Sequence, residues 1–191
     1  MQLPKAFFRI SAFSIFLFFV SLTGALAIDD GFGPSVKVEG KHFTVYYSPK
    51  LDLFSLARKL NVRASDRMLA GKYAAGEGVW LTDMLDTLFI QVCDILDMQL
   101  YSFHGTIKIC KDAKQLNDIY YNFFQKDIKT RSFYAYSLNT IYTSADNFSR
   151  EIIGHEIAHA VISHYFVVLP SVRIQEVLAM YVEYQLRQAG Q

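Results

Sequence analysis

The sequence predicts a single α+β domain, and two kinds of segment support this prediction. Short segments at 35–39, 42–47 and 106–110 are rich in β-branched and aromatic residues, which is typical of strands. Longer segments at 80–98 and 151–165 repeat apolar residues at helical spacing. The two kinds of segment alternate along the chain, with no internal repeat and no low-complexity stretch. We therefore expect one mixed domain with a single core.

The first half of the domain contributes two strands and two helices. The segments 35–39 and 42–47 are expected to be strands separated by a tight connection around Gly40. A short helix is expected at 51–60. The stretch 71–78 contains three glycines and is expected to be a loop. The next segment begins at Trp80 and is the long helix described above.

The second half begins with the strand at 106–110. Asp112 follows it and is expected to cap a helix that ends near residue 125, because a carboxylate at this position accepts a hydrogen bond from the first turn. The segments 133–136 and 140–143 are then expected to pair as a β-hairpin.

The most informative motif lies in the helix at 151–165, which Asp146 or Asn147 is expected to cap. Residues 155–159 read His-Glu-Ile-Ala-His. Positions i and i+4 share one helix face, so His155 and His159 can hold one zinc ion, with Glu156 beside the open position of the metal as a general base. The alternative is a buried helix with incidental ionisable residues, but such residues are costly to bury unless something binds them.

A third metal ligand is available on the next helical segment. The chain breaks at 169–171 and resumes a helical pattern at 172–188, with Glu176 near its start. Three protein ligands and a water define a catalytic rather than a structural zinc site. The apolar neighbours of Glu176 favour the role of ligand over that of an ordinary exposed glutamate.

These motifs together resemble those of the gluzincin metallopeptidases, in particular the group called peptidase MA-like. The likeness rests on the pattern at 155–159 and on the Glu-x-x-Ala-x-Tyr pattern at 176–181. The segments 132–146 and 42–47 are similar to the upstream strands of that group. The resemblance implies a zincin-like fold, with a small twisted mixed sheet, a backing helix, an active-site helix and a C-terminal helix that carries the glutamate ligand.

The resemblance also implies an activity. One zinc ion per chain would be held by His155, His159 and Glu176, and Glu156 would act as general base in peptide-bond hydrolysis. The substrate would be a peptide or protein that adds in extended form to the edge of the sheet. We expect the segment 133–136 to be that edge.

The chain departs from the family pattern at two positions. Val177 replaces a glycine, and Met180 stands where thermolysin-like members carry an aspartate that orients a histidine ligand. Glu183 lies on the same helix face as Glu176 and could replace that aspartate, although a surface glutamate is the favoured interpretation.

Peptide hydrolysis also needs a donor for the developing oxyanion. His164 is five residues beyond His159, about 140° around the helix, and is expected to lie outside the site. The sequence does not distinguish among the oxyanion candidates, which are Tyr136, Tyr142, Tyr165, Tyr181 and Arg173.

The N-terminus has the pattern of an export signal. Lys5 and Arg9 precede an apolar run at 10–20, and small residues end at Ala27 before two aspartates. We expect a signal peptide at 1–27, a peptidase domain at 28–191 and a periplasmic or secreted product. An uncleaved anchor is the alternative, but the apolar run is short for a bilayer span.

Composition limits the class of partner. The 191 residues carry 19 Lys and Arg against 18 Asp and Glu, without a basic cluster, so a nucleic acid is not expected. Once the leader is removed, no membrane partner is expected. Cys93 and Cys110 could form a disulfide in an oxidising compartment or remain two buried thiols.

The printed sequence ends at Gln191, just after the second motif helix, as in the smallest gluzincins, called minigluzincins. A shallow cleft would imply loose specificity or dependence on a protein partner that activates or inhibits the enzyme. The segment 28–34 is interpreted as a flexible tail, with a small pro-segment as the alternative. Two other functions stay open: a catalytically idle zinc-binding domain that recognises a protein or peptide through its edge strand, and an interaction protein without metal.

Overall fold

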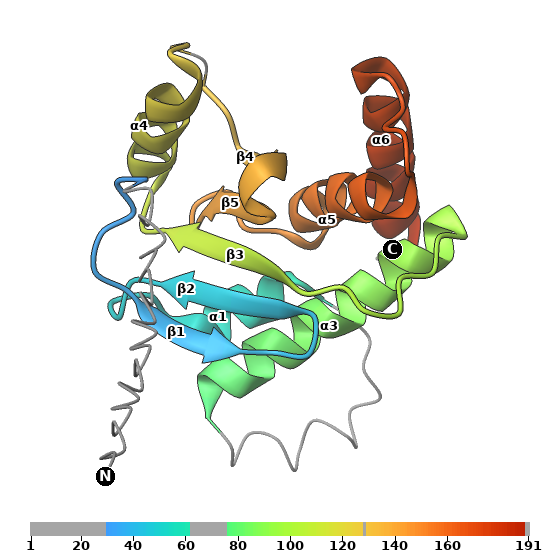
Figure 1. The fold of residues 1–191 in the computed structure, drawn as a ribbon. Coiled ribbons are helices and arrows are strands. Elements are labelled where there is room, and N and C mark those ends of the chain that lie inside the picture. Colours follow the sequence, from blue (N-terminus) through green and yellow to red (C-terminus); the bar gives the residue numbers. More distant parts are fainter. Residues whose placement is uncertain (1–29, 62–75, 128, 190–191) are drawn as a thin grey trace, which may run out of the picture.

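The computed structural model describes residues 30–61, 76–127 and 129–189. These residues form a five-stranded mixed sheet and five α-helices (Figure 1), consistent with the predicted α+β class. The strands are β1 (Val36–Glu39), β2 (Phe43–Tyr47), β3 (Gly105–Cys110), β4 (Ser132–Ala135) and β5 (Thr140–Ser144). The helices are α1 (Leu53–Lys59), α3 (Glu77–Leu96), α4 (Ala113–Phe124), α5 (Arg150–Tyr165) and α6 (Val172–Ala189), with a 3₁₀ turn η2 (Tyr136–Leu138). The predicted leader at 1–27 lies outside the described residues.

The sheet has the strand order β1-β2-β3-β5-β4. Strands β2, β3 and β5 are parallel, and β1 and β4 are antiparallel edges. The predicted hairpin is confirmed, since β4 pairs with β5 and Phe133 lies opposite Tyr142. Asn139 reverses the chain in the left-handed region at φ 45°, which asparagine tolerates better than most residues. The first strand of the hairpin is an edge strand, as predicted.

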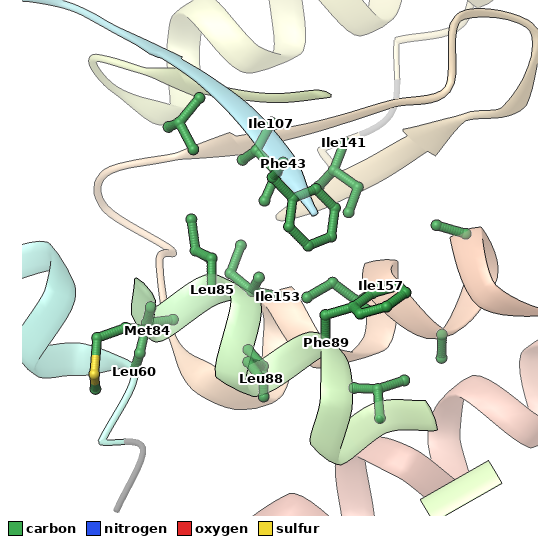
Figure 2. Close-up of a cluster of buried hydrophobic side chains, with 14 of the residues drawn as sticks. Phe43, Leu60, Met84, Leu85, Leu88, Phe89, Ile107, Ile141, Ile153 and Ile157 are labelled. Atoms are coloured by element: carbon green, nitrogen blue, oxygen red, sulfur yellow. The ribbon is translucent and has the colours of Figure 1, made fainter. Parts of the chain in front are cut away.

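The main core lies between one face of the sheet and the helices α1, α3 and α5. Figure 2 shows Phe43, Ile107 and Ile141 of the sheet directed toward α3 and α5. On α5, Ile153 and Ile157 are fully buried in this core. Because they occupy one side of the helix, residues two positions along the chain are directed to the opposite side. The core therefore sets the direction in which His155 and His159 point.

A second apolar cluster lies on the other face of the sheet, beneath α4. It contains Cys110, whereas Cys93 of α3 belongs to the main core on the opposite face. Both thiols are free and buried, so the disulfide left open by the sequence is not formed. Burial raises the pKa of Cys93 to about 11 and that of Cys110 to about 12, which keeps both thiols protonated and unreactive.

The segment that begins at Asp30 is held against this second cluster. The Asp30 carboxylate pairs with Lys108 and accepts a 2.5 Å hydrogen bond from the hydroxyl of Tyr142. Phe32 is buried in the cluster, and its carbonyl accepts a hydrogen bond from the side-chain amide of Gln115. For residues 30–32, the interpretation as a flexible tail is therefore wrong. The segment lies on the α4 side of the sheet, in the second cluster, and not over His155 and His159.

The helix caps were predicted with mixed success. Asp112 caps α4 as predicted, accepting from the N–H of Gln115. For α5, the prediction of Asp146 or Asn147 is wrong, because the cap is Ser149, whose hydroxyl accepts from the N–H of Ile152. Asp146 instead accepts from the N–H of Ala113 at the start of α4. A contact with a distant segment thus competes for the side chain that local sequence favours as a cap.

Helix α3 begins earlier than predicted. It starts at Glu77, so Gly78 lies inside the helix and not in a loop, while residues 71–75 of the glycine-rich stretch fall outside the described part. A Cβ atom at Gly78 would come within 2.8 Å of a methyl group of Val38 in β1. The glycine therefore permits close packing of the helix on the edge strand.

Helix α6 packs mainly against α5, and to a lesser extent against α3. The contact is closest at Gly154, where an added Cβ would lie 2.2 Å from Cδ1 of Leu186. Arg150 of α5 also donates a hydrogen bond to the carbonyl of Leu186. This packing fixes the position of α6 relative to the motif helix. Within the described residues, no helix is long and apolar enough to span a membrane.

Candidate metal centre and cleft

Helix α5 brings the two motif histidines together on one face. Their Nε2 atoms are 3.2 Å apart, and both side chains are largely buried. The spacing i, i+4 predicts this proximity, because it stacks side chains one turn apart. Burial and the neighbouring His155 lower the pKa of His159, which favours the neutral ring that a metal requires.

Helix α6 places Glu176 against both rings. Its carboxylate oxygens lie 3.5 Å from Nε2 of His159 and 3.6 Å from Nε2 of His155. A tetrahedral zinc ion with bonds of about 2.0–2.1 Å requires donor atoms about 3.3–3.4 Å apart. The three donors therefore form a triangle of the size that one face of such a coordination shell needs. Among the described residues, no other group of three His, Cys, Asp or Glu has metal-binding spacing.

Glu183 lies behind His155, contrary to the favoured interpretation as a surface residue. It is only 19 % exposed, and its Oε2 is 3.5 Å from Nδ1 of His155. Nδ1 is buried and has no hydrogen-bond partner among the described residues. The Glu183 carboxylate and the His155 ring are therefore at ion-pair distance but do not form a hydrogen bond. Its other carboxylate oxygen accepts a 2.6 Å hydrogen bond from Arg187. A carboxylate behind a ligand histidine is the arrangement that orients the ring toward a metal.

Glu156 is buried beside the histidine pair. Oε1 accepts a 2.6 Å hydrogen bond from the hydroxyl of Ser132 on β4. Burial raises the pKa of Glu156 to about 7; the nearby Glu176 carboxylate adds to this effect, and the Ser132 hydrogen bond opposes it. A carboxylate with a pKa near neutrality can both accept and return a proton.

The site opens into a cleft of about 520 Å³. Figure 1 shows α4 and α6 on either side of β4, and residues of all three elements line the cleft together with α5. Its lining contains His155, Glu156, His159 and Glu176, with Tyr120, Phe124, Phe133, Tyr136, Leu169 and Val172 as large apolar neighbours. A separate cavity of about 440 Å³ lies beside Phe32 and α4, away from these residues.

The structure separates the five candidate oxyanion donors. Tyr136 alone among them lines the cleft, and its side chain is exposed. Tyr142 is wrong as a candidate, because it is buried on the other face of the sheet and bonded to Asp30. The side chains of Tyr165, Tyr181 and Arg173 are exposed and do not line the cleft. His164 contacts the carbonyl of Ala160 and the ring of Phe103 and lies outside the cluster of two histidines and Glu176, as predicted.

Two residues of the cleft were not found by sequence reasoning. Ser132 holds Glu156, and the hydroxyl of Tyr134 accepts a 3.3 Å hydrogen bond from Ser163 of α5. Both lie on β4, where alternate residues point to the same face of the sheet. This alternation was visible in the sequence, and a predicted edge strand above the motif helix could have drawn attention to them.

Comparisons with the profiles of known protein families, with curated proteins and with solved structures find no match.

Proposed function

We propose that the chain is a zinc-dependent peptidase with a zincin-like fold, exported by its N-terminal leader. The observation that carries the proposal is the triangle of His155, His159 and Glu176, with the buried carboxylate of Glu156 beside it. A zinc ion bound there would polarise a carbonyl group and make a water molecule acidic at neutral pH. The side chains present fit such an ion in donor type and in spacing.

The residues of the chain supply the remaining steps. Glu156 accepts the proton of the attacking water and delivers it to the leaving amine, which the raised pKa of its carboxyl group favours. Ser132 keeps this carboxylate oriented by its hydrogen bond. Tyr136 would donate a hydrogen bond to the developing oxyanion, a role supported by the position of this residue in the lining of the same cleft.

The substrate would bind along β4. As an edge strand, β4 pairs on one side with β5, and within the described residues it has no strand partner on its other side. An extended peptide can pair with such an edge through its main chain. The cleft adjoins β4 along Ser132, Phe133 and Tyr134, so a peptide in this position would pass the metal centre.

Metal analysis and a peptide-cleavage assay on four proteins test this proposal. The wild type should contain about one zinc per chain and cleave a mixed peptide library. His155→Ala should lose both properties. Glu156→Gln should keep zinc and lose at least about 100-fold in turnover. His164→Ala changes a histidine of the same helix outside the cluster and should resemble the wild type.

The other outcomes separate the alternatives. A wild type that takes up no zinc, even when zinc is added, would exclude the peptidase. Zinc binding without cleavage of any library peptide would instead indicate a catalytically idle zinc-binding domain. Full turnover in Glu156→Gln would assign the general base to another residue.

A further inference from the structure

Helix α6 and the turn before it expose an unusual amount of apolar surface. Residues 165–169 of the turn are Tyr-Phe-Val-Val-Leu, and all five are exposed. Val167 is fully exposed and Val168 is 81 % exposed. Two adjacent aliphatic side chains with almost no contact to the fold form a projecting tip and not a groove. In water such a tip is unfavourable, because its apolar area stays hydrated.

The apolar surface continues along α6. Ala179, Val182 and Leu186 of this helix are buried in the main core. Its opposite side exposes a stripe at spacings of three and four residues, so the members are neighbours on the helix. The stripe consists of Ile174, Val177, Met180, Tyr181 and Tyr184. Figure 1 shows α6 at the end of the molecule farthest from β1 and β2. We call the stripe and the turn together the 165–184 surface.

The surface carries one positive and two negative side chains, and the two carboxylates already have contacts. Its Lys, Arg, Asp and Glu residues are Arg173, Glu176 and Glu183. Both glutamates face the histidines, and Glu183 is also paired with Arg187. Arg173 is exposed and, within the described part of the chain, has no ion pair or hydrogen bond. A partner that fits this surface is therefore apolar with a negative charge at its boundary.

We propose that the 165–184 surface docks the protein on an anionic phospholipid bilayer. The valine tip would enter the acyl region, the hydroxyls of Tyr165, Tyr181 and Tyr184 would stay at the headgroup level, and Arg173 would meet lipid phosphates. A second copy fits less well, because both carboxylates of this face already contact other side chains: Glu176 contacts the two histidines and Glu183 contacts Arg187. The proposal differs from the expectation that no membrane is a partner once the leader is removed.

Docking would also place the metal cleft at the bilayer surface. Leu169 of the turn and Val172 of α6 belong to the 165–184 region and also line the cleft. The substrate that reaches the cleft would thus be a polypeptide that lies close to the lipid. The docking itself does not depend on the proposed peptidase activity.

Vesicle flotation tests the proposal. Every protein compared has the same N-terminal end, so that differences in flotation come from the 165–184 surface. The wild type should float with vesicles of phosphatidylcholine and phosphatidylglycerol, and less with phosphatidylcholine alone. Val167→Asp/Val168→Asp should reduce the partition coefficient at least about tenfold. Arg173→Gln should reduce it about fivefold on the anionic vesicles only, the equivalent of about 1 kcal/mol. Tyr101→Asp alters a 94 % exposed aromatic residue after α3 and should have no effect.

Unchanged thermal unfolding of the double variant would show that its fold is intact, as expected for two residues with so few contacts. The proposal is overturned if the wild type does not float, or if the double variant floats equally well. A concentration-dependent dimer that Val177→Asp dissociates, without vesicle binding, would instead assign the surface to a second copy of the chain.

Discussion

The carboxylate of Glu183 lies 3.5 Å from Nδ1 of His155, on the side of the ring away from His159 and Glu176. The thermolysin-like pattern, to which the motifs are similar, has an aspartate three residues earlier, at the position of Met180. Here a glutamate one helical turn further along α6 reaches the histidine with its longer side chain. Movement by about half an ångström would bring the two atoms to hydrogen-bond distance. Glu183 therefore approaches His155 from a different position of α6 than that aspartate would.

Glu183→Ala should weaken zinc binding about 10- to 100-fold, because Nδ1 of His155 would lose the group that orients the ring. Competition with a chelator measures the change in Kd. Arg187→Gln provides the control, since it removes the other partner of Glu183 and leaves the carboxylate in place. Equal zinc affinity of Glu183→Ala and wild type would show that Glu183 does not support the site.

Ser132→Ala should slow peptide hydrolysis about tenfold or more with little change in zinc content, because Glu156 would lose an oriented hydrogen bond. That bond lowers the pKa of Glu156, so its loss raises this pKa. A general base acts when deprotonated, and the acidic limb of the pH–rate profile should therefore move to higher pH. Ser163→Ala, in the same cleft, should leave the limb in place. A shift to lower pH would contradict the assignment.

Gly154→Ala should destabilise the protein by about 1 kcal/mol, although alanine is the better helix former by a similar amount. The added methyl group would lie 2.2 Å from Cδ1 of Leu186, which is itself buried. Chemical denaturation measures the change. In a Leu186→Ala background the clash is absent, so Gly154→Ala should there become stabilising. If Gly154→Ala stabilises the wild type as well, the close contact of α5 and α6 is not limiting.

Asp30→Asn should reduce the free energy of unfolding by roughly 1–3 kcal/mol at neutral pH, since Lys108 would lose its anionic partner. Burial alone would raise the pKa of Asp30, but bonds from Lys108, Tyr142 and the N–H of Phe32 hold it below its ordinary value. A depressed folded-state pKa stabilises the protein above the unfolded pKa of about 3.9 and less below it.

The stability difference between wild type and Asp30→Asn should accordingly shrink as the pH falls below about 4, where Asp30 takes up a proton. Urea denaturation from pH 3 to pH 7 measures this. Asp52→Asn, at the exposed cap of α1, is the control away from the Lys108 pair. A difference that is constant with pH would indicate that the loss comes from packing and not from charge.

Local pattern accounts for most of the elements that were predicted correctly. The hairpin of β4 and β5, the cap at Asp112 and the motif helix follow from residues close together in sequence. The nearness of His155 and His159 is likewise a property of helical spacing. The position of Glu176 does not follow from local pattern alone, because its approach to the histidines depends on the turn at 169–171 and on the packing of α6.

The errors share a physical cause. Asp146 was predicted to cap α5 but binds the start of α4. Asp30 was interpreted as part of a flexible tail but pairs with Lys108, 78 residues away. Each side chain has a plausible local role and a stronger partner from a distant segment. Propensity rules cannot include such partners, because they compare only neighbours along the chain.

The sequence alone determined the chemistry available to this protein: the histidine pair, the adjacent glutamate and two helices on which to place ligands. Only the tertiary structure decided how those groups are arranged relative to one another. It placed Glu183 behind His155, joined Ser132 to Glu156 and left one side of α6 exposed. The physical reason is that spacing along one helix fixes relations within that helix, whereas relations between segments depend on how the whole core packs.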